Sequence, residues 1–292
     1  MAIPGLQIIG ERINPGFRST RRLFETGDLA GIQALARRQA QAGATSLNIN
    51  TGADALARPD FLGAVIRAVQ AVVDLPLCLD SPDRRVQEIG LRAYEPGRAG
   101  GRKPIINSIT EARWVLPSAG GSCPAQVIVM ASERMEGGEA RQNRTGAEIH
   151  ATARRCVERL VADHGLVPGE IIVDVSISAL AADLTGMTRA AIEGVERIAS
   201  DPALAGVHLC GGLSNLAQQL PATTRSGLPL REGLENAFLT LAVPRGLDMI
   251  IGTPWRDYRL LPADDPLLAA LREIIALDGR PALRRLLQLQ RS

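Results

Sequence analysis

The stretch Leu77-Cys78-Leu79-Asp80-Ser81 sets the pattern of this 292-residue chain, because it is a short apolar run that ends in a carboxylate and a hydroxyl. Seven apolar runs end in a carboxylate, an Asn or a Ser, and an eighth, at 249–251, ends in Gly252 and Thr253. The seven are 6–9 with Glu11 and Asn14, 47–49 with Asn50, 77–79 with Asp80 and Ser81, 105–106 with Asn107 and Ser108, 127–130 with Ser132 and Glu133, 171–173 with Asp174 and Ser176, and 207–210 with Ser214 and Asn215.

Segments with the spacing of amphipathic helices lie between most of these runs. They are 29–43 with Asp28 as N-cap, 82–93, 145–164, a segment capped by Thr188, 230–245 and 266–277. Short strands that alternate with helices predict an α/β fold, a (β/α)₈ TIM barrel, whose active site lies at the carboxyl ends of the strands. We therefore expect a single domain spanning 1–292, with an extra C-terminal helix at 281–289 that covers the amino-terminal face or forms a dimer contact.

Composition narrows the classes of function. A net charge of +2 and an aromatic content of 3% argue against nucleic-acid binding and against attraction to a membrane surface. The start of the chain has no charged-then-apolar leader, and no apolar run reaches about 18 residues, so a cytoplasmic location is expected. Cysteines 78, 123, 156 and 210 are scattered and read as small buried hydrophobes.

The candidate chemistry is that of carboxylates and amides. The three histidines lack metal-ligand spacing, so no metal site is predicted. The only lysine, Lys103, precedes a strand, which argues against a Schiff-base enzyme, and no GxSxG motif is present. A set of carboxylates and amides suits a flat heterocycle rich in N–H donors, although Asp80 and Asn107 could each instead cap a helix. The set at the predicted rim is Glu11, Asp80, Asn107, Asp174 and Asn215.

Several of these segments, in order, resemble the pterin-binding methyltransferases, the family of the methyltetrahydrofolate:corrinoid protein methyltransferases and of the folate barrel of cobalamin-dependent methionine synthase. The resemblance begins at Gly10-Glu11-Arg12-Ile13-Asn14 and covers roughly residues 8–252. The other matching segments are 42–44, 47–50, 77–81, 105–108, 127–130, 171–174, 211–215, 235–239 and 246–249.

The resemblance implies a homodimeric barrel that moves a methyl group between tetrahydrofolate and the cobalt of a corrinoid (cobalamin) on a partner protein. It implies that Asp80, Asn107 and Asp174 hold the polar edge of the pterin, and that Asn215 reaches the nitrogen that carries the methyl group. It leaves the direction of transfer open. The other residues expected to bind the substrate are Glu11, Asn14, Asn48, Asn50, Ser81, Ser108, Met130, Gly212, Ser214, Gln218 and Arg225.

The chain departs from the family pattern in two places. Asn48 stands where the family usually has Asp, so one carboxylate near the pterin is lost. Val175 stands where the family often has Pro. Two alternative functions stay open. One is a dihydropteroate synthase-like enzyme, which needs cations near the last strands that Gly252-Thr253-Pro254 does not supply. The other is a non-catalytic subunit that binds folate or docks a corrinoid protein.

Overall fold

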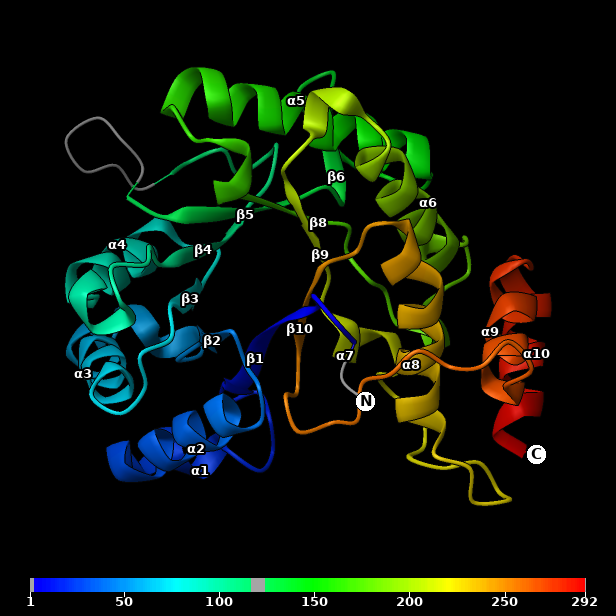
Figure 1. Ribbon diagram of the computed structural model, residues 1–292, viewed down its shortest axis with the longest axis horizontal. Coiled ribbons are helices and arrows are strands. Elements are labelled where there is room, and N and C mark those ends of the chain that lie inside the picture. The colour runs from blue at the N-terminus through cyan, green and yellow to red at the C-terminus, as the bar shows by residue number, and fades with distance from the viewer. Residues whose placement is uncertain (1–2, 117–123, 292) are drawn as a thin grey trace.

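Eight parallel strands form one sheet that curls into a nearly closed barrel (Figure 1). The computed structural model describes residues 3–116 and 124–291. The sheet order β10-β1-β2-β3-β4-β5-β8-β9 follows the chain and confirms the predicted fold. The strands are β1 (Gln7–Ile13), β2 (Ser46–Ile49), β3 (Leu77–Asp80), β4 (Ile105–Ile109), β5 (Gln126–Met130), β8 (Ile171–Asp174), β9 (His208–Cys210) and β10 (Met249–Gly252).

The weakest join in the barrel lies between β9 and β10. Strand β10 pairs with β1 along four residues, but it meets the β9 segment only through single contacts. The backbone N–H of Ile251 donates to the carbonyl of Gly211 at 3.0 Å, and that of Asp248 donates to Leu209 at 3.2 Å. At the amino end, His208 Nδ1 lies 2.6 Å from the Asp248 carboxylate. We call this join the β9–β10 seam.

The barrel interior is filled in two levels, because side chains alternate between the two faces of a strand. The lower level is an apolar plug of residues that pack together inside the barrel. Two positions further along most strands, the same inward face carries a polar residue at the carboxyl end. The plug consists of Ile9, Cys78, Ile105, Ile128, Ile172, Cys210 and Met249.

Helices surround the barrel, and most of them bury an apolar face in the common core. Asp28 caps α2 through the N–H of Gly31, as predicted, and Thr145, where a helix was predicted to begin, caps α5 with a capping box to Glu148. The main helices are α1 (Arg21–Thr26), α2 (Leu29–Gln41), α3 (Pro59–Gln70), α4 (Arg84–Ala93), α5 (Gly146–His164), α6 (Met187–Ala199), α7 (Leu213–Leu216), α8 (Leu230–Ala242), α9 (Pro266–Ile275) and α10 (Gly279–Arg291).

Some predicted details are wrong. Helix α4 begins after Asp83 rather than at Pro82, because the Asp83 carboxylate accepts the N–H of Arg85. Helix α6 begins after Gly186, and Asp183 rather than Thr188 accepts its first N–H groups. Helices α1 and α3 and the antiparallel hairpin of β6 (Glu133–Glu136) and β7 (Glu139–Gln142) were not predicted. Between β4 and β5 the described residues, 110–116 and 124–125, contain no helix.

The C-terminal helix α10 packs beside α9 at the edge of the molecule (Figure 1). Leu286 and Leu289 are buried there, whereas Leu287 is 49% exposed. The N–H of Gly279 donates to Leu184, and the carbonyl of Gln290 accepts the N–H of Arg225. Both partners lie in loops that follow strands, so α10 does not cover the amino-terminal face.

Candidate active site

A cavity of about 490 Å³ opens at the carboxyl ends of the strands, directly above the apolar plug. It collects side chains from β1, β2, β3, β4, β5 and β8 and from the α7 segment, so residues far apart in sequence meet at one rim. The predicted site residues among its lining are Glu11, Asn14, Asn48, Asp80, Asn107, Met130, Asp174, Gly212, Ser214, Asn215 and Gln218.

Asp80 is the centre of an amide network on the floor of the cavity. Its Oδ2 accepts hydrogen bonds from Asn48 Nδ2 at 2.7 Å and from Asn50 Nδ2 at 3.1 Å. Asn107 Nδ2 donates to Asn48 Oδ1 at 3.3 Å. Burial raises the pKa of Asp80, and the two amides oppose that rise. An Asp at position 48 would repel Asp80, whereas the amide of Asn48 donates a hydrogen bond that orients it.

Asp174 faces the same cavity from β8. Its side chain is nearly buried, and burial raises its pKa to about 6, while the N–H of Ser176 donates to Oδ1 at 2.6 Å. Among residues 3–116 and 124–291, no cation pairs with Asp174 or Asp80. Neither residue caps a helix, since Asp83 caps α4 and Asp174 closes a turn onto Ser176. Both carboxylates are thus available to N–H donors of a ligand.

Glu11 ties three segments together at the carboxyl end of the β9–β10 seam. Its Oε2 accepts from the Ser214 hydroxyl at 2.7 Å, and its Oε1 accepts from the Thr253 hydroxyl at 2.6 Å. Glu11 is only 6% exposed, and both of its oxygens are occupied. The geometry therefore makes Glu11 a positioning residue that fixes the start of α7.

Helix α7 presents Asn215 to the cavity with a defined orientation. Gln218 Nε2 donates to Asn215 Oδ1 at 2.7 Å, so the amide nitrogen of Asn215 stays free to donate. That nitrogen lies against Gly212, where an added Cβ would come within 2.7 Å of it. A side chain at position 212 would therefore displace Asn215.

Four predicted residues lie outside the cavity lining. Ser81 accepts the N–H of Asp83, and Ser108 lines a groove beside Arg113. Asn50 contacts the site only through Asp80. Arg225 is held beside α10 by Gln290. The lining residues that were not predicted come from loops or from β10 and are Gly16, Phe17, Ser176, Ile177, Ser178 and Ile251.

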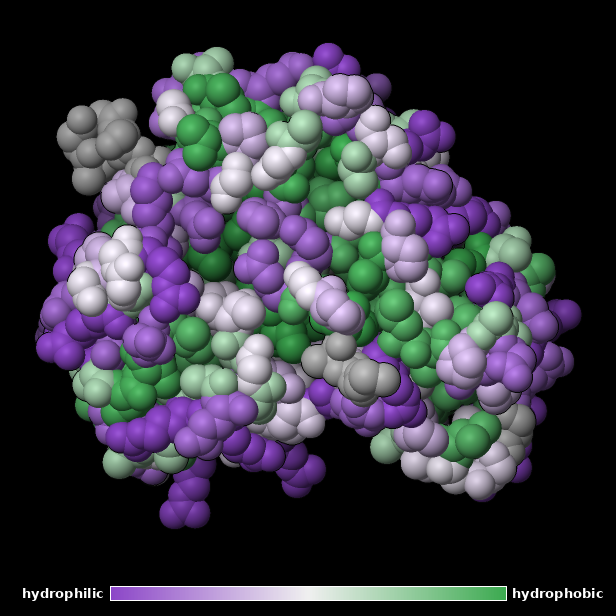
Figure 2. Space-filling model, viewed as in Figure 1, coloured by the Kyte–Doolittle hydropathy of each residue, from purple (hydrophilic) through white to green (hydrophobic). Residues whose placement is uncertain are grey.

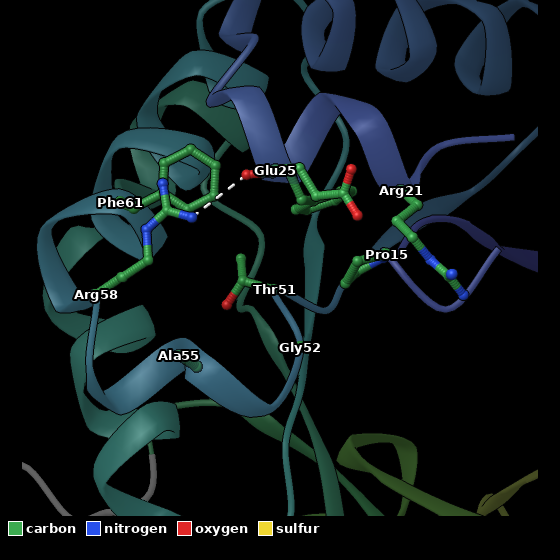
Figure 3. A pocket seen from close by; sticks show the side chains of 9 residues that line it. Pro15, Arg21, Glu25, Thr51, Gly52, Ala55, Arg58 and Phe61 are labelled. Atoms are coloured by element: carbon green, nitrogen blue, oxygen red, sulfur yellow. Dashed lines mark hydrogen bonds between the residues drawn. The ribbon is translucent and has the colours of Figure 1, made fainter. Parts of the chain in front are cut away.

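A smaller cavity of about 260 Å³ lies between α1, α3 and the loop after β2 (Figure 3). Arg58 stacks on Phe61 there, 4.2 Å from the ring centroid, and donates to the carbonyl of Phe24 at 3.3 Å. Glu25 and Arg21 line the cavity from α1. This cavity has fewer converging donors and acceptors, so the larger one is the candidate active site.

Three cysteines, Cys78, Cys156 and Cys210, are free and buried, as predicted, and Cys123 lies outside the described residues. In the part of the chain that the structure describes, no group of three or more His, Cys, Asp or Glu is placed to hold a metal ion. Within the same part, none of the helices has the length and apolar character needed to cross a membrane.

Comparison with known proteins identifies the family. The model of a family described as pterin binding enzyme matches residues 11–252, which shows that the chain belongs to the pterin-binding enzyme family. A methylcorrinoid:tetrahydrofolate methyltransferase of Eubacterium limosum is 28% identical over 255 residues, which are 85% of this chain and 84% of that protein.

Solved dihydropteroate synthases share the fold. That of Vibrio fischeri superimposes with a TM-score of 0.58 at 14% identity and covers 96% of each chain. That of Coxiella burnetii, in complex with pteroic acid, gives a TM-score of 0.57 at 15% identity and covers 95% of this chain and 96% of its own. At these identities the likeness extends to the barrel alone.

Proposed function

We propose that the protein transfers a methyl group between tetrahydrofolate and the cobalt of a corrinoid carried by a partner protein. The observation that carries this proposal is that Asp80 and Asp174, with Asn107 beside them, face one cavity without a cation partner among the described residues. The Eubacterium limosum relative supports the reaction, and its name favours transfer from methylcorrinoid to tetrahydrofolate.

The pterin would bind by its polar edge at the cavity floor. A carboxylate accepts two parallel N–H bonds from an aminopyrimidinone, and an Asn can both donate and accept. Asp80 and Asp174 would take the donor groups, and Asn107 and Asn48 would complete the pattern. The Asp174 carboxylate, whose pKa burial raises, gains a partner when the pterin binds.

Asn215 would act at the nitrogen that carries the methyl group. That nitrogen gains electron density as the methyl leaves, so a hydrogen-bond donor there stabilises the transition state more than the bound substrate. The free amide nitrogen of Asn215, oriented by Gln218, supplies such a donor without being a strong acid. The same contact serves transfer in either direction, since both directions share one transition state.

The corrinoid is a substrate brought by its carrier protein, and the open mouth of the cavity is the side from which it would approach. A corrinoid protein is therefore the proposed partner. A homodimer and a cytoplasmic location remain predictions from the sequence and the resemblance.

A dihydropteroate synthase-like activity is the second candidate, because solved members share the barrel. Such an enzyme needs free cations for pyrophosphate near the last strands. Arg256 is the nearest cation after β10, and its guanidinium is paired with Glu235, which is 1% exposed. This pairing disfavours the second candidate. The third, a non-catalytic folate-binding subunit, differs from the first only in turnover.

Three measurements separate the three candidates. The protein is incubated with methylcobalamin and tetrahydrofolate, and the corrinoid spectrum is followed, with Asp174→Ala as the matched inactive variant. Loss of the methylcobalamin spectrum with the wild type alone supports methyl transfer. Folate binding by the wild type without any change in the corrinoid spectrum would indicate the non-catalytic subunit. Pyrophosphate release from a pterin pyrophosphate would indicate the synthase.

A further inference from the structure

Beside the active-site cavity lies a row of alternating aromatic and guanidinium groups, which we call the cation row. Arg12 lies over the Phe17 ring at 3.9 Å and 5.8 Å from the centroid of Trp255, and Arg38 lies over Trp255 at 3.8 Å. Phe17 also lines the active-site cavity. The row therefore starts at the mouth of that cavity and continues into a groove of about 440 Å³ lined by Arg12, Ser19, Leu35, Arg38 and Trp255.

The arginines of the cation row form no ion pair among the described residues. Across residues 3–116 and 124–291, no carboxylate forms an ion pair with Arg12 or Arg38, and the charge of adjacent Glu11 offsets that of Arg12 only in part. Arg12 Nη2 donates to Ser19 at 2.6 Å, but its Nε is buried without a partner. Burial lowers the pKa of Arg12, and Arg256 and Arg38 lower it further, although Glu11 opposes them. Such a group is stabilised when an anion binds.

The surrounding segment is basic as well. Between residues 12 and 41 the chain has six arginines (12, 18, 21, 22, 37 and 38) and two carboxylates, Glu25 and Asp28, whereas the whole chain has a net charge of only +2. Figure 2 shows hydrophilic side chains gathered over α1 and α2. This concentration of charge fits a ligand with several carboxylates.

We infer that the cation row binds the tail of a folate, with its aminobenzoyl ring against Phe17 and Trp255 and its glutamyl carboxylates on Arg12 and Arg38. The inference rests on the proposed function, because a pterin on the cavity floor must extend its tail through the mouth. Because Arg12 and Arg38 already stack on Phe17 and Trp255, the aminobenzoyl ring would pack against the remaining surface of these two rings, and the guanidinium groups suit carboxylates. A chain of γ-linked glutamates would continue along the groove that Arg12 and Arg38 line.

The smaller cavity between α1 and α3 is a poorer route for this tail. Its Glu25 carboxylate, which lies toward Arg21, would repel the glutamates, and its Arg58 is already bonded to Phe24 and stacked on Phe61 (Figure 3). The cation row has no such carboxylate among the residues that line its groove.

The test compares three ligands on four proteins. The ligands are a tetrahydropterin without a tail, tetrahydrofolate with one glutamate and tetrahydrofolate with three. The proteins are the wild type, Arg12→Gln, Arg38→Gln and the control Arg37→Gln, which removes the same charge from an exposed neighbour on α2 that does not line the groove. Affinities are measured by fluorescence titration at low and high salt.

We expect the wild type to bind the triglutamate more tightly than the monoglutamate, and more so at low salt. Arg38→Gln should weaken triglutamate binding roughly 2- to 5-fold, as for an exposed ion pair, and Arg12→Gln roughly tenfold. Both should bind the tail-less pterin like the wild type, and Arg37→Gln should match the wild type throughout.

Four results would overturn the inference. Equal losses for the tail-less pterin would assign the arginines to folding, and equal affinities for all three ligands would remove the subsite while leaving the proposed function intact. Binding of inorganic pyrophosphate that depends on Arg38 and matches the triglutamate would make the row a phosphate site. Unchanged folate affinities with weaker turnover of a corrinoid protein would make it a docking site. Failure of every pterin to bind would reject the proposed function itself.

Discussion

Replacing Asn215 by Ala should slow methyl transfer far more than it weakens folate binding. The variant removes one hydrogen-bond donor at the reacting nitrogen, a loss that costs about 3–4 kcal/mol in a closed site. Asn215 is exposed, so water can replace part of the donor, and we expect about 1.4–2.7 kcal/mol, or roughly 10- to 100-fold in rate. Folate affinity should change less than about threefold.

Two companion variants sharpen this expectation. Gln218→Ala keeps Asn215 but removes the 2.7 Å bond that fixes its amide, so the rate should fall only about 2- to 10-fold, the value of one neutral hydrogen bond. Asn50→Ala removes a donor to Asp80 outside the cavity, so affinity should fall while the rate constant is kept.

The assay combines single-turnover rates, read from the corrinoid spectrum, with folate titrations and melting temperatures on the same preparations. If rate and affinity fall together in Asn215→Ala and the melting temperature drops, Asn215 shapes the loop after β9 and does not assist the chemistry. If Gln218→Ala transfers the methyl group more slowly than Asn215→Ala, the loss of rate in Gln218→Ala does not come from a misoriented Asn215 amide.

Three further predictions concern pH and packing. Folate affinity should be constant above about pH 7 and fall as the pH drops through about 6, because the ligand needs the Asp174 anion and burial raises the pKa of Asp174 to about 6. Folate titration of Asp174→Asn should show a lower affinity that does not change over this pH range. The His208–Asp248 bond raises the pKa of His208, so the bond should stabilise the fold by about 1 kcal/mol or less, fully below pH 6.5 and no longer once the pH has risen through the folded-state pKa. Urea unfolding of the wild type and His208→Gln at pH 6 and 8 measures this contribution. A difference in unfolding free energy between the two proteins that grew with pH would contradict the prediction. Gly146→Ala should destabilise the protein by about 1–3 kcal/mol, because the new Cβ would lie 2.5 Å from the Glu193 Cβ and 2.9 Å from the Glu193 backbone. In the control Gly169→Ala, the new Cβ meets nothing within 4 Å, so the melting temperature should be unchanged.

The inward half of the site could be predicted from the sequence because strands alternate with a period of two. Cys78 in the plug and Asp80 at the rim are two residues apart, and the same step links Ile172 to Asp174. The period does not extend to Ser81 and Ser108, which lie outside the cavity lining. Ser81 follows the end of β3, and the register of β4 is irregular at Ser108.

The parts that were missed depend on contacts between distant segments. Nothing local to Glu11 shows that its two oxygens are occupied by Ser214 and Thr253. Arg225 follows α7 closely in sequence, yet Gln290 holds it beside α10. Phe17 enters the cavity from an irregular loop, where no periodic pattern predicts direction. Such placements follow from tertiary packing rather than from local propensity.

The β9–β10 seam has a consequence for synthesis on the ribosome. Strand β1 emerges first, but its partner on one side, β10, is not made until residue 252 has been added. Until then the nascent sheet has two open edges, at β1 and at β9, and open edges invite pairing with other chains. The last quarter of the chain therefore decides whether the earlier strands are protected, and nascent chains that stop short of β10 should depend on chaperones.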